Sequence, residues 1–141
     1  MTQTQFLLLP VFVQFALTLY VLIRLGQGRV RAVRRGRVKL SDVDSNKSAY
    51  PEATRNFANN YQSQFELPVM FYAVVALAVN TGLGDGVLIV LAWGFVALRL
   101  MHSFVHTGRN DITLRFWIFV AGLIFLTGMW VWFGFRLFVI G

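Results

Sequence analysis

Four long apolar runs limit the possible folds of this chain more than any other feature of its sequence. They cover approximately residues 6–25, 57–79, 87–105 and 114–140. An α-helix needs about 20 apolar residues to cross the hydrocarbon core of a bilayer, so each run is long enough to span it. Charged residues make up 13% of the chain, roughly half of their share in soluble domains. We therefore predict an all-α integral membrane protein, a four-transmembrane-helix bundle forming a single domain over residues 1–141.

The first apolar run is expected to remain in the protein as a span. No basic residue precedes it and no small-residue cleavage pattern follows it, so it lacks the features of a secretory signal peptide. Pro10, Gln14 and Thr18 interrupt the run. Neighbouring helices of a membrane bundle tolerate such residues.

Basic residues gather in one part of the sequence. Nine of the 13 lysines and arginines lie between Arg24 and Arg55, most of them in residues 26–48, a charged segment that we predict to be a long loop. Loops rich in Lys and Arg stay on the cytoplasmic side of a membrane. The turn at residues 80–86 carries none, so both chain termini are expected on the opposite side. The clustering beside an apolar run indicates membrane topology and no nucleic-acid partner.

Ten polar residues lie on the predicted helices or directly at their ends. They are Arg29, Arg31, Arg55, Asn59, Gln62, Glu66, Arg99, His102, His106 and Arg115. The spacing is i, i+4, i+7 and i+11 from Arg55 onward and i, i+3 and i+7 from Arg99 onward, so each set shares one helix face. A charge at the bilayer centre costs about 2.5–3.5 kcal/mol unless it faces a partner or a cavity. We therefore expect these groups to gather near the cytoplasmic surface and form a cationic pocket for a small anion.

Other interpretations of the same residues are structural. In the first of these interpretations, Arg99 and Glu66 form an ion pair that holds the bundle together. The basic loop residues fix the topology and contact anionic lipid; these are Arg34, Arg35, Arg37 and Lys39. Two histidines without a cysteine are a weak zinc signal, so we predict no metal site. The chain has no cysteine, which also excludes disulfides and a cysteine nucleophile.

The order of these motifs resembles the MAPEG family, the membrane-associated proteins of eicosanoid and glutathione metabolism. The motifs are, in chain order, GQGRVR at Gly26–Arg31, Arg55-x-x-x-Asn59-x-x-Gln62, PVMF at Pro68–Phe71, Arg99-x-x-His102-x-x-x-His106, and Arg115 at the start of the fourth helix. Together they cover essentially the whole chain. The resemblance implies four-helix membrane subunits in a homotrimer, with glutathione as co-substrate held between neighbouring subunits.

The resemblance also implies a role for each site residue. Arg115 would be the catalytic residue and stabilise the glutathione thiolate. A close cation lowers the pKa of a thiol from its usual value of about 8.5, and the thiolate is the nucleophile. The other polar residues would bind the carboxylates, amine and amides of glutathione; they are Arg29, Arg31, Arg55, Asn59, Gln62, Glu66, Arg99, His102 and His106.

Two positions differ from the family pattern. Gln62 stands where the second-helix motif has an acidic residue, and the nearest carboxylate, Glu66, follows one turn later. A second register through Asn59, Ser63 and Glu66 supplies the acidic residue but leaves out Arg55, and both registers stay open. The other difference is the last histidine of the third-helix motif, where the animal enzymes commonly carry a tyrosine. Histidine still forms hydrogen bonds there.

Two functional hypotheses follow. The first is a glutathione-dependent membrane transferase or peroxidase that acts on a hydrophobic small molecule arriving from the lipid. The alternative is a non-catalytic relative that keeps the trimeric bundle and acts as a membrane binding or scaffold protein, as the departures at Gln62 and His106 suggest. A channel or transporter is disfavoured, because the helix halves away from the cytoplasm are too apolar for a polar path across the membrane.

Overall fold

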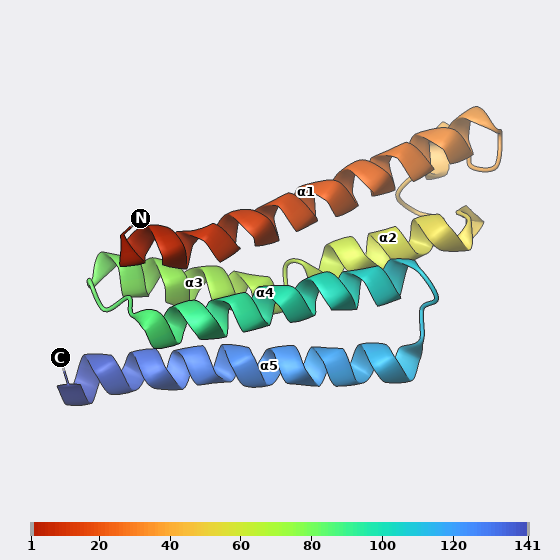
Figure 1. The fold of residues 1–141 in the computed structure, drawn as a ribbon. Helices are drawn as coiled ribbons and strands as arrows, with labels where there is room; N and C mark the ends of the chain where they lie inside the picture. Colours follow the sequence, from red (N-terminus) through yellow and green to blue (C-terminus); the bar gives the residue numbers. More distant parts are fainter. Residues whose placement is uncertain (1, 141) are drawn as a thin grey trace.

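The computed structural model describes residues 2–140 as a bundle of long helices (Figure 1). The α-helices are α1 (Gln3–Arg34), α2 (Glu52–Ser63), α3 (Leu67–Asn80), α4 (Gly86–Thr107) and α5 (Ile112–Phe135). Short 3-10 turns occupy Leu40–Asp42 and Lys47–Ala49, and a π-helical turn, Arg136–Ile140, extends α5. The all-α fold class predicted from the sequence is confirmed.

Successive long helices run in opposite directions. α2 and α3 follow each other end to end beside α1, and α4 and α5 form an antiparallel pair next to them (Figure 1). Residues 2 and 140 therefore lie at the same end of the bundle as the α3–α4 turn. The segment that joins α1 to α2 lies at the opposite end, together with the α4–α5 turn (Figure 1).

Local sequence signals fix the helix ends. Gly36 and Gly82 adopt φ values of 68° and 70°, a left-handed conformation that glycine reaches without strain and that commonly ends helices. At both ends the next residue's N–H bonds back to a carbonyl of the last turn, as in Leu83 N–H to Ala78 O at 3.0 Å. Asp85 caps the start of α4 by accepting a hydrogen bond from a backbone N–H in its first turn.

The first helix is longer than predicted. We expected residues 26–48 to be a loop, but α1 continues through its glycines to Arg34. Gly28 explains part of this, because a Cβ atom there would lie 2.7 Å from Thr54 Oγ1. Glycine thus permits a close crossing of α1 and α2, and the contact with α2 stabilises a segment whose composition alone indicates a loop.

The second predicted span is interrupted. We expected one helix through residues 57–79, but α2 ends at Ser63 and α3 begins at Leu67. Pro68 causes the break, since its ring has no N–H to donate and would clash with the carbonyl of Gln64 in a continuous helix. The predicted stripe through Glu66 therefore stops one turn early, and Glu66 is exposed in the break.

The apolar core occupies the end of the bundle that holds residues 2 and 140. Leu7, Phe71, Phe95 and Met129, which come from α1, α3, α4 and α5, are fully buried there. Many large apolar side chains are exposed instead, and Phe104, for example, is 85% exposed. Soluble proteins rarely expose so much contiguous apolar surface, so these faces suit contact with lipid.

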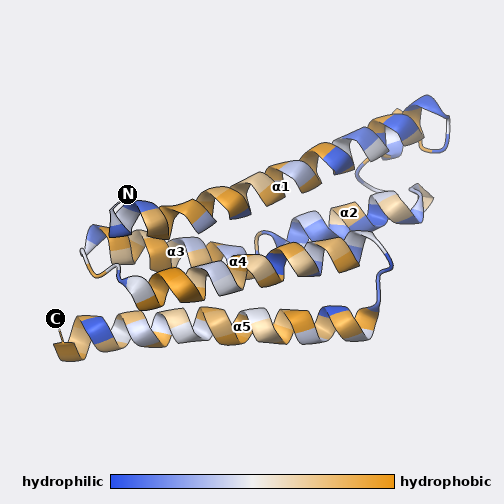
Figure 2. Cartoon of the chain, viewed as in Figure 1, coloured by the Kyte–Doolittle hydropathy of each residue, from blue (hydrophilic) through white to orange (hydrophobic). Residues whose placement is uncertain are grey.

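Four segments of the structure are long and apolar enough to cross a membrane. They are Gln3–Arg34, Glu52–Asn80, Gly86–Thr107 and Ile112–Ile140. The chain is therefore a multi-pass membrane protein. Its hydrophilic residues gather on α2 and the adjoining end of α1 (Figure 2), and the candidate site lies there.

Candidate functional site

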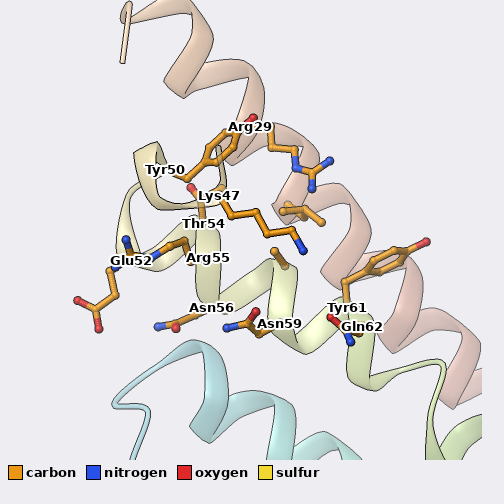
Figure 3. Close-up of a pocket in the computed structure, with 12 residues that line it drawn as sticks. Arg29, Lys47, Tyr50, Glu52, Thr54, Arg55, Asn56, Asn59, Tyr61 and Gln62 are labelled. Carbon is orange, nitrogen blue, oxygen red and sulfur yellow. The ribbon is translucent and has the colours of Figure 1, made fainter. Parts of the chain in front are cut away.

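A polar pocket of about 410 Å³ lies between the last turns of α1 and the length of α2. Figure 3 shows its side chains, which come from both helices and from the segment that joins them. The lining residues are Leu25, Arg29, Lys47, Tyr50, Glu52, Thr54, Arg55, Asn56, Ala58, Asn59, Tyr61 and Gln62. Cations and side-chain amides predominate among its polar groups, which suits an anionic ligand with several hydrogen-bonding groups.

The pocket's position follows from the crossing of α1 and α2. The close approach at Gly28 and Thr54 brings the two helices together on one side of the pocket. Arg29 follows Gly28 directly on α1, and Arg55 follows Thr54 on α2, so each arginine projects next to the crossing point. Asn59 and Gln62 lie one and two turns further along α2. The sequence motifs at the end of the first span and in the second helix thus meet at one place.

The pocket's cations have few partners within the protein. The Arg29 guanidinium lies 6.0 Å from the ring centroid of Tyr50, a cation–π distance. Arg55 Nη1 donates a hydrogen bond to Ser48 O at 3.3 Å. In residues 2–140 neither arginine forms an ion pair with a carboxylate. Both guanidinium groups therefore keep free hydrogen-bond donors for a ligand.

The structure brings four of the ten predicted site residues into this pocket and places six elsewhere. The four are Arg29, Arg55, Asn59 and Gln62. The six are Arg31, Glu66, Arg99, His102, His106 and Arg115. Arg31 lies on the other side of the α1–α2 crossing, in a small hollow of about 110 Å³ with Arg24 and Gln27.

The polar stripe of α4 points into the bundle. Arg99, His102 and His106 share one face, as predicted, and all three are buried within the single chain. Arg99 Nη2 donates hydrogen bonds to the backbone oxygen and the Oγ of Ser63 at 3.1 and 3.0 Å. The described residues contain no ion pair between Arg99 and Glu66, so the alternative in which these two residues pair is not observed.

A buried amide network joins α1, α4 and the C-terminal end of α2. Gln14 Nε2 donates to Gln64 Oε1 at 2.7 Å, and Gln64 Nε2 donates to Asn60 Oδ1 at 2.8 Å. Ser103 Oγ accepts a bond from Gln64 and donates one to Asn60, both at 3.2 Å. The sequence reasoning missed these residues. The available signal was the i, i+4 spacing of Asn60 and Gln64, together with an amide in the middle of the first span.

Arg115 occupies the start of α5 and is partly buried. Its Nη1 donates a hydrogen bond to Asn110 Oδ1 at 2.7 Å. It does not line the α1–α2 pocket of its own chain. The predicted thiolate-stabilising arginine and the predicted ligand-binding residues of α2 therefore belong to two separate regions of one subunit.

An apolar groove adjoins the polar pocket. It has a volume of about 560 Å³ and lies between α1 and the α2–α3 break. Phe12, Phe15 and Leu19 supply much of its apolar wall, and Gln64 and Tyr72 add polar atoms. Tyr61 lines both the groove and the polar pocket, so the two spaces share a wall.

These features define an integral membrane bundle with a cationic pocket at one end. The MAPEG family model matches residues 7–135, which is nearly the whole chain. The protein therefore belongs to the MAPEG family, a family of glutathione-related membrane enzymes. No curated protein and no solved structure shows a significant match to this chain.

Proposed function

We propose that this protein is a glutathione-dependent transferase or peroxidase acting on hydrophobic electrophiles at the membrane surface. The observation that carries this proposal is the pocket between α1 and α2. It gathers Arg29, Arg55, Asn59 and Gln62 around one cavity, and apart from the bond that Arg55 donates to Ser48 their side-chain donors are free of bonds to the described residues. Membership of the MAPEG family supports glutathione as the thiol.

The pocket's donor set fits most of the groups of glutathione as a substrate. Two guanidinium groups suit carboxylates, which they bind in a bidentate manner. The amides of Asn59 and Gln62 suit the peptide groups, which both donate and accept. The ammonium group fits less well, because the one carboxylate of the lining, Glu52, points away from the cavity centre (Figure 3).

We further propose that the complete site forms between neighbouring copies in a homotrimer. Arg115 lies outside the α1–α2 pocket of its own chain, so a second copy is needed to bring this cation to a thiol bound there. Arg31, Arg99, His102, His106 and Glu66 stay candidate ligand-binding residues in that assembly, although a single chain does not place them in the pocket. Burial within the bundle makes a structural role for Arg99 and His102 the simpler assignment.

The chemistry that we propose is nucleophilic. In conjugation, the thiolate sulfur donates an electron pair to an electrophilic carbon, the S–C bond forms, and the leaving group departs with its bonding pair. In peroxide reduction, two glutathione molecules supply two electrons, the O–O bond breaks to give an alcohol and water, and glutathione disulfide forms. Arg115 supports both routes by stabilising the thiolate.

The apolar groove offers a place for the hydrophobic substrate. Its aromatic wall faces outward from α1, with Phe12 67% exposed, so a lipid-soluble molecule reaches it directly from the bilayer. Tyr61 separates the groove from the polar pocket. We also propose that the end of the bundle carrying the pocket faces the cytoplasm, with residues 2 and 140 on the other side, because most basic residues lie at that end.

A turnover assay on the purified protein tests this proposal. Wild-type protein is expected to conjugate a hydrophobic electrophile or reduce a hydroperoxide only when glutathione is present. Arg115→Ala should lower kcat by about a hundredfold, since a transition-state charge loses its stabilising group. Arg109→Ala removes an exposed arginine from the α4–α5 turn that precedes Arg115 and should leave the rate unchanged. Absence of thiol-dependent turnover in the wild type contradicts the enzymatic proposal.

A second candidate function is that of a non-catalytic binding or scaffold protein. Gln62 favours it, because an amide stands where the family pattern has an acid and the pocket interior lacks a carboxylate. Isothermal titration separates the two candidates. Glutathione binding without turnover supports the scaffold, whereas binding with turnover supports the enzyme.

A further inference from the structure

We propose that Lys47, on the turn between α1 and α2, is a specificity-determining residue that binds one carboxylate of the thiol and makes the site selective for dianionic ligands. This inference rests on the proposed function and deepens it. Lys47 lies between the first-helix motif and the second-helix motif from which the predicted site residues came, in a segment that was predicted to be a loop. The structure gives it a place in the pocket itself.

The first observation is the direction of the side chain. Lys47 is exposed on its turn, and its side chain reaches across the pocket toward α1, so that its ammonium group lies over the cavity (Figure 3). The Glu52 carboxylate points the other way (Figure 3). Among residues 2–140 no carboxylate lies within ion-pair distance of Lys47, so its charge has no internal partner.

The second observation is that the turn is anchored on three sides. Tyr50 is 6% exposed and packs with Ala32 and Val38 in a small apolar cluster. Its hydroxyl donates to Val43 O at 2.9 Å, and Arg55 donates to Ser48 O. The backbone of Lys47–Ala49 is thereby held against both α1 and α2, so Lys47 is carried on a fixed base and not on a free loop.

The third observation is the charge balance of the pocket. Arg29, Lys47 and Arg55 contribute three positive charges to the pocket wall, and the one carboxylate of the lining, Glu52, points away from the cavity centre (Figure 3). The charged groups of glutathione left for the pocket are two carboxylates and one ammonium group, because the thiolate is assigned to Arg115 of a second copy. Three cations around one cavity favour a ligand with two carboxylates over a ligand with one, and Lys47 is the cation beyond the two arginines.

The chemistry of lysine suits this position. Its ammonium group is a compact charge on a flexible stem, whereas a guanidinium binds in a planar fork. Arg29 and Arg55 are held by Tyr50 and Ser48, which fixes their directions. Lys47 is the adjustable cation of the three and adapts to whichever carboxylate the arginines leave unpaired.

Isothermal titration of four variants with three ligands tests the inference. The proteins are the wild type, Lys47→Ala, Lys47→Arg and the control Lys39→Ala, which removes an exposed lysine of the same segment outside the pocket. The ligands are glutathione and two derivatives in which either the glycine or the glutamyl carboxylate is masked. We expect Lys47→Ala to weaken glutathione binding roughly two- to fivefold, as for loss of a solvent-exposed ion pair. Lys47→Arg should restore most of it, and Lys39→Ala should change nothing.

The derivatives decide whether Lys47 recognises a specific carboxylate. One of the two should bind wild type and Lys47→Ala with equal affinity, because the group that Lys47 contacts is already masked. Equal weakening of all three ligands, or no effect of Lys47→Ala on glutathione, overturns the role of Lys47 and leaves the proposed function intact. Absence of glutathione binding to the wild type overturns both. Unchanged melting of Lys47→Ala in detergent shows that the variant is folded.

Discussion

Two polar regions built on the same helix behave in opposite ways. Asn59 and Gln62 face the pocket between α1 and α2, whereas Asn60 and Gln64 turn into the bundle. The inward pair is fully buried, and its amides bond to Gln14 and Ser103. The outward pair is exposed, and its amides have no hydrogen-bond partner among the side-chain bonds of the described residues.

The two regions differ in whether their polar residues hold the bundle together or stay available to a ligand. Burial favours pairing within the protein, because an unpaired buried polar group costs about 1–3 kcal/mol; in this network Asn60 Nδ2 and Gln14 Oε1 are the buried atoms without a partner among the described residues. An amide at a solvent-filled pocket forms hydrogen bonds with water, so the lack of a protein partner costs no free energy. Its donors stay available to a ligand. Both regions consist of Asn and Gln, so residue type does not distinguish them. They differ in the face of the helix from which their side chains project.

The largest effect is expected from breaking the inward region. Gln64→Ala removes the residue that links Gln14, Asn60 and Ser103. It leaves Gln14 Nε2 buried without a partner, and Asn60 and Ser103 keep only the bond between them. It should lower the free energy of unfolding by about 2–3 kcal/mol, measured as an earlier thermal denaturation midpoint in detergent. An unchanged denaturation midpoint would show that the network contributes nothing to stability and that the buried amides do not differ from the exposed ones in this respect.

A smaller and opposite effect is expected two residues earlier. Gln62→Ala should leave melting unchanged within about 0.5 kcal/mol, as for most exposed substitutions. It should weaken glutathione binding about two- to tenfold, the range for one neutral hydrogen bond. Titration and melting on the same preparation check both parts. Loss of stability without loss of affinity would place Gln62 with the inward region.

The sequence predicts the membrane fold well, because the signal is local. Each apolar run is long enough to form a span by itself, and glycine and aspartate mark several helix ends. The break at Gln64–Glu66 was also predictable from Pro68 and was missed because the apolar pattern of residues 67–79 suggested one continuous helix. The helical course of residues 26–34 was not predictable, since it depends on contact with α2 at Gly28 and Thr54.

The site is only partly predictable for the same reason. Spacing correctly grouped Arg55, Asn59 and Gln62 on one face, and it grouped Arg99 with the two histidines on another. It gave no information on whether a face turns toward a pocket or into the bundle, because both stripes are polar. That choice depends on partners distant in sequence, such as Gln14, which lies 50 residues from Gln64. The place of Lys47 depends likewise on how its turn packs against α1.

Glutathione affinity in a matched pair of arginine variants tests most directly whether the pocket between α1 and α2 binds the thiol. Arg55 lines the pocket, whereas Arg37 is exposed on the segment beyond α1 and lines none of the described cavities. Isothermal titration should show glutathione binding about ten- to hundredfold weaker in Arg55→Ala than in wild type, as for loss of a charged bond, with Arg37→Ala unchanged. Equal affinities in all three proteins would contradict the claim that this pocket binds the thiol.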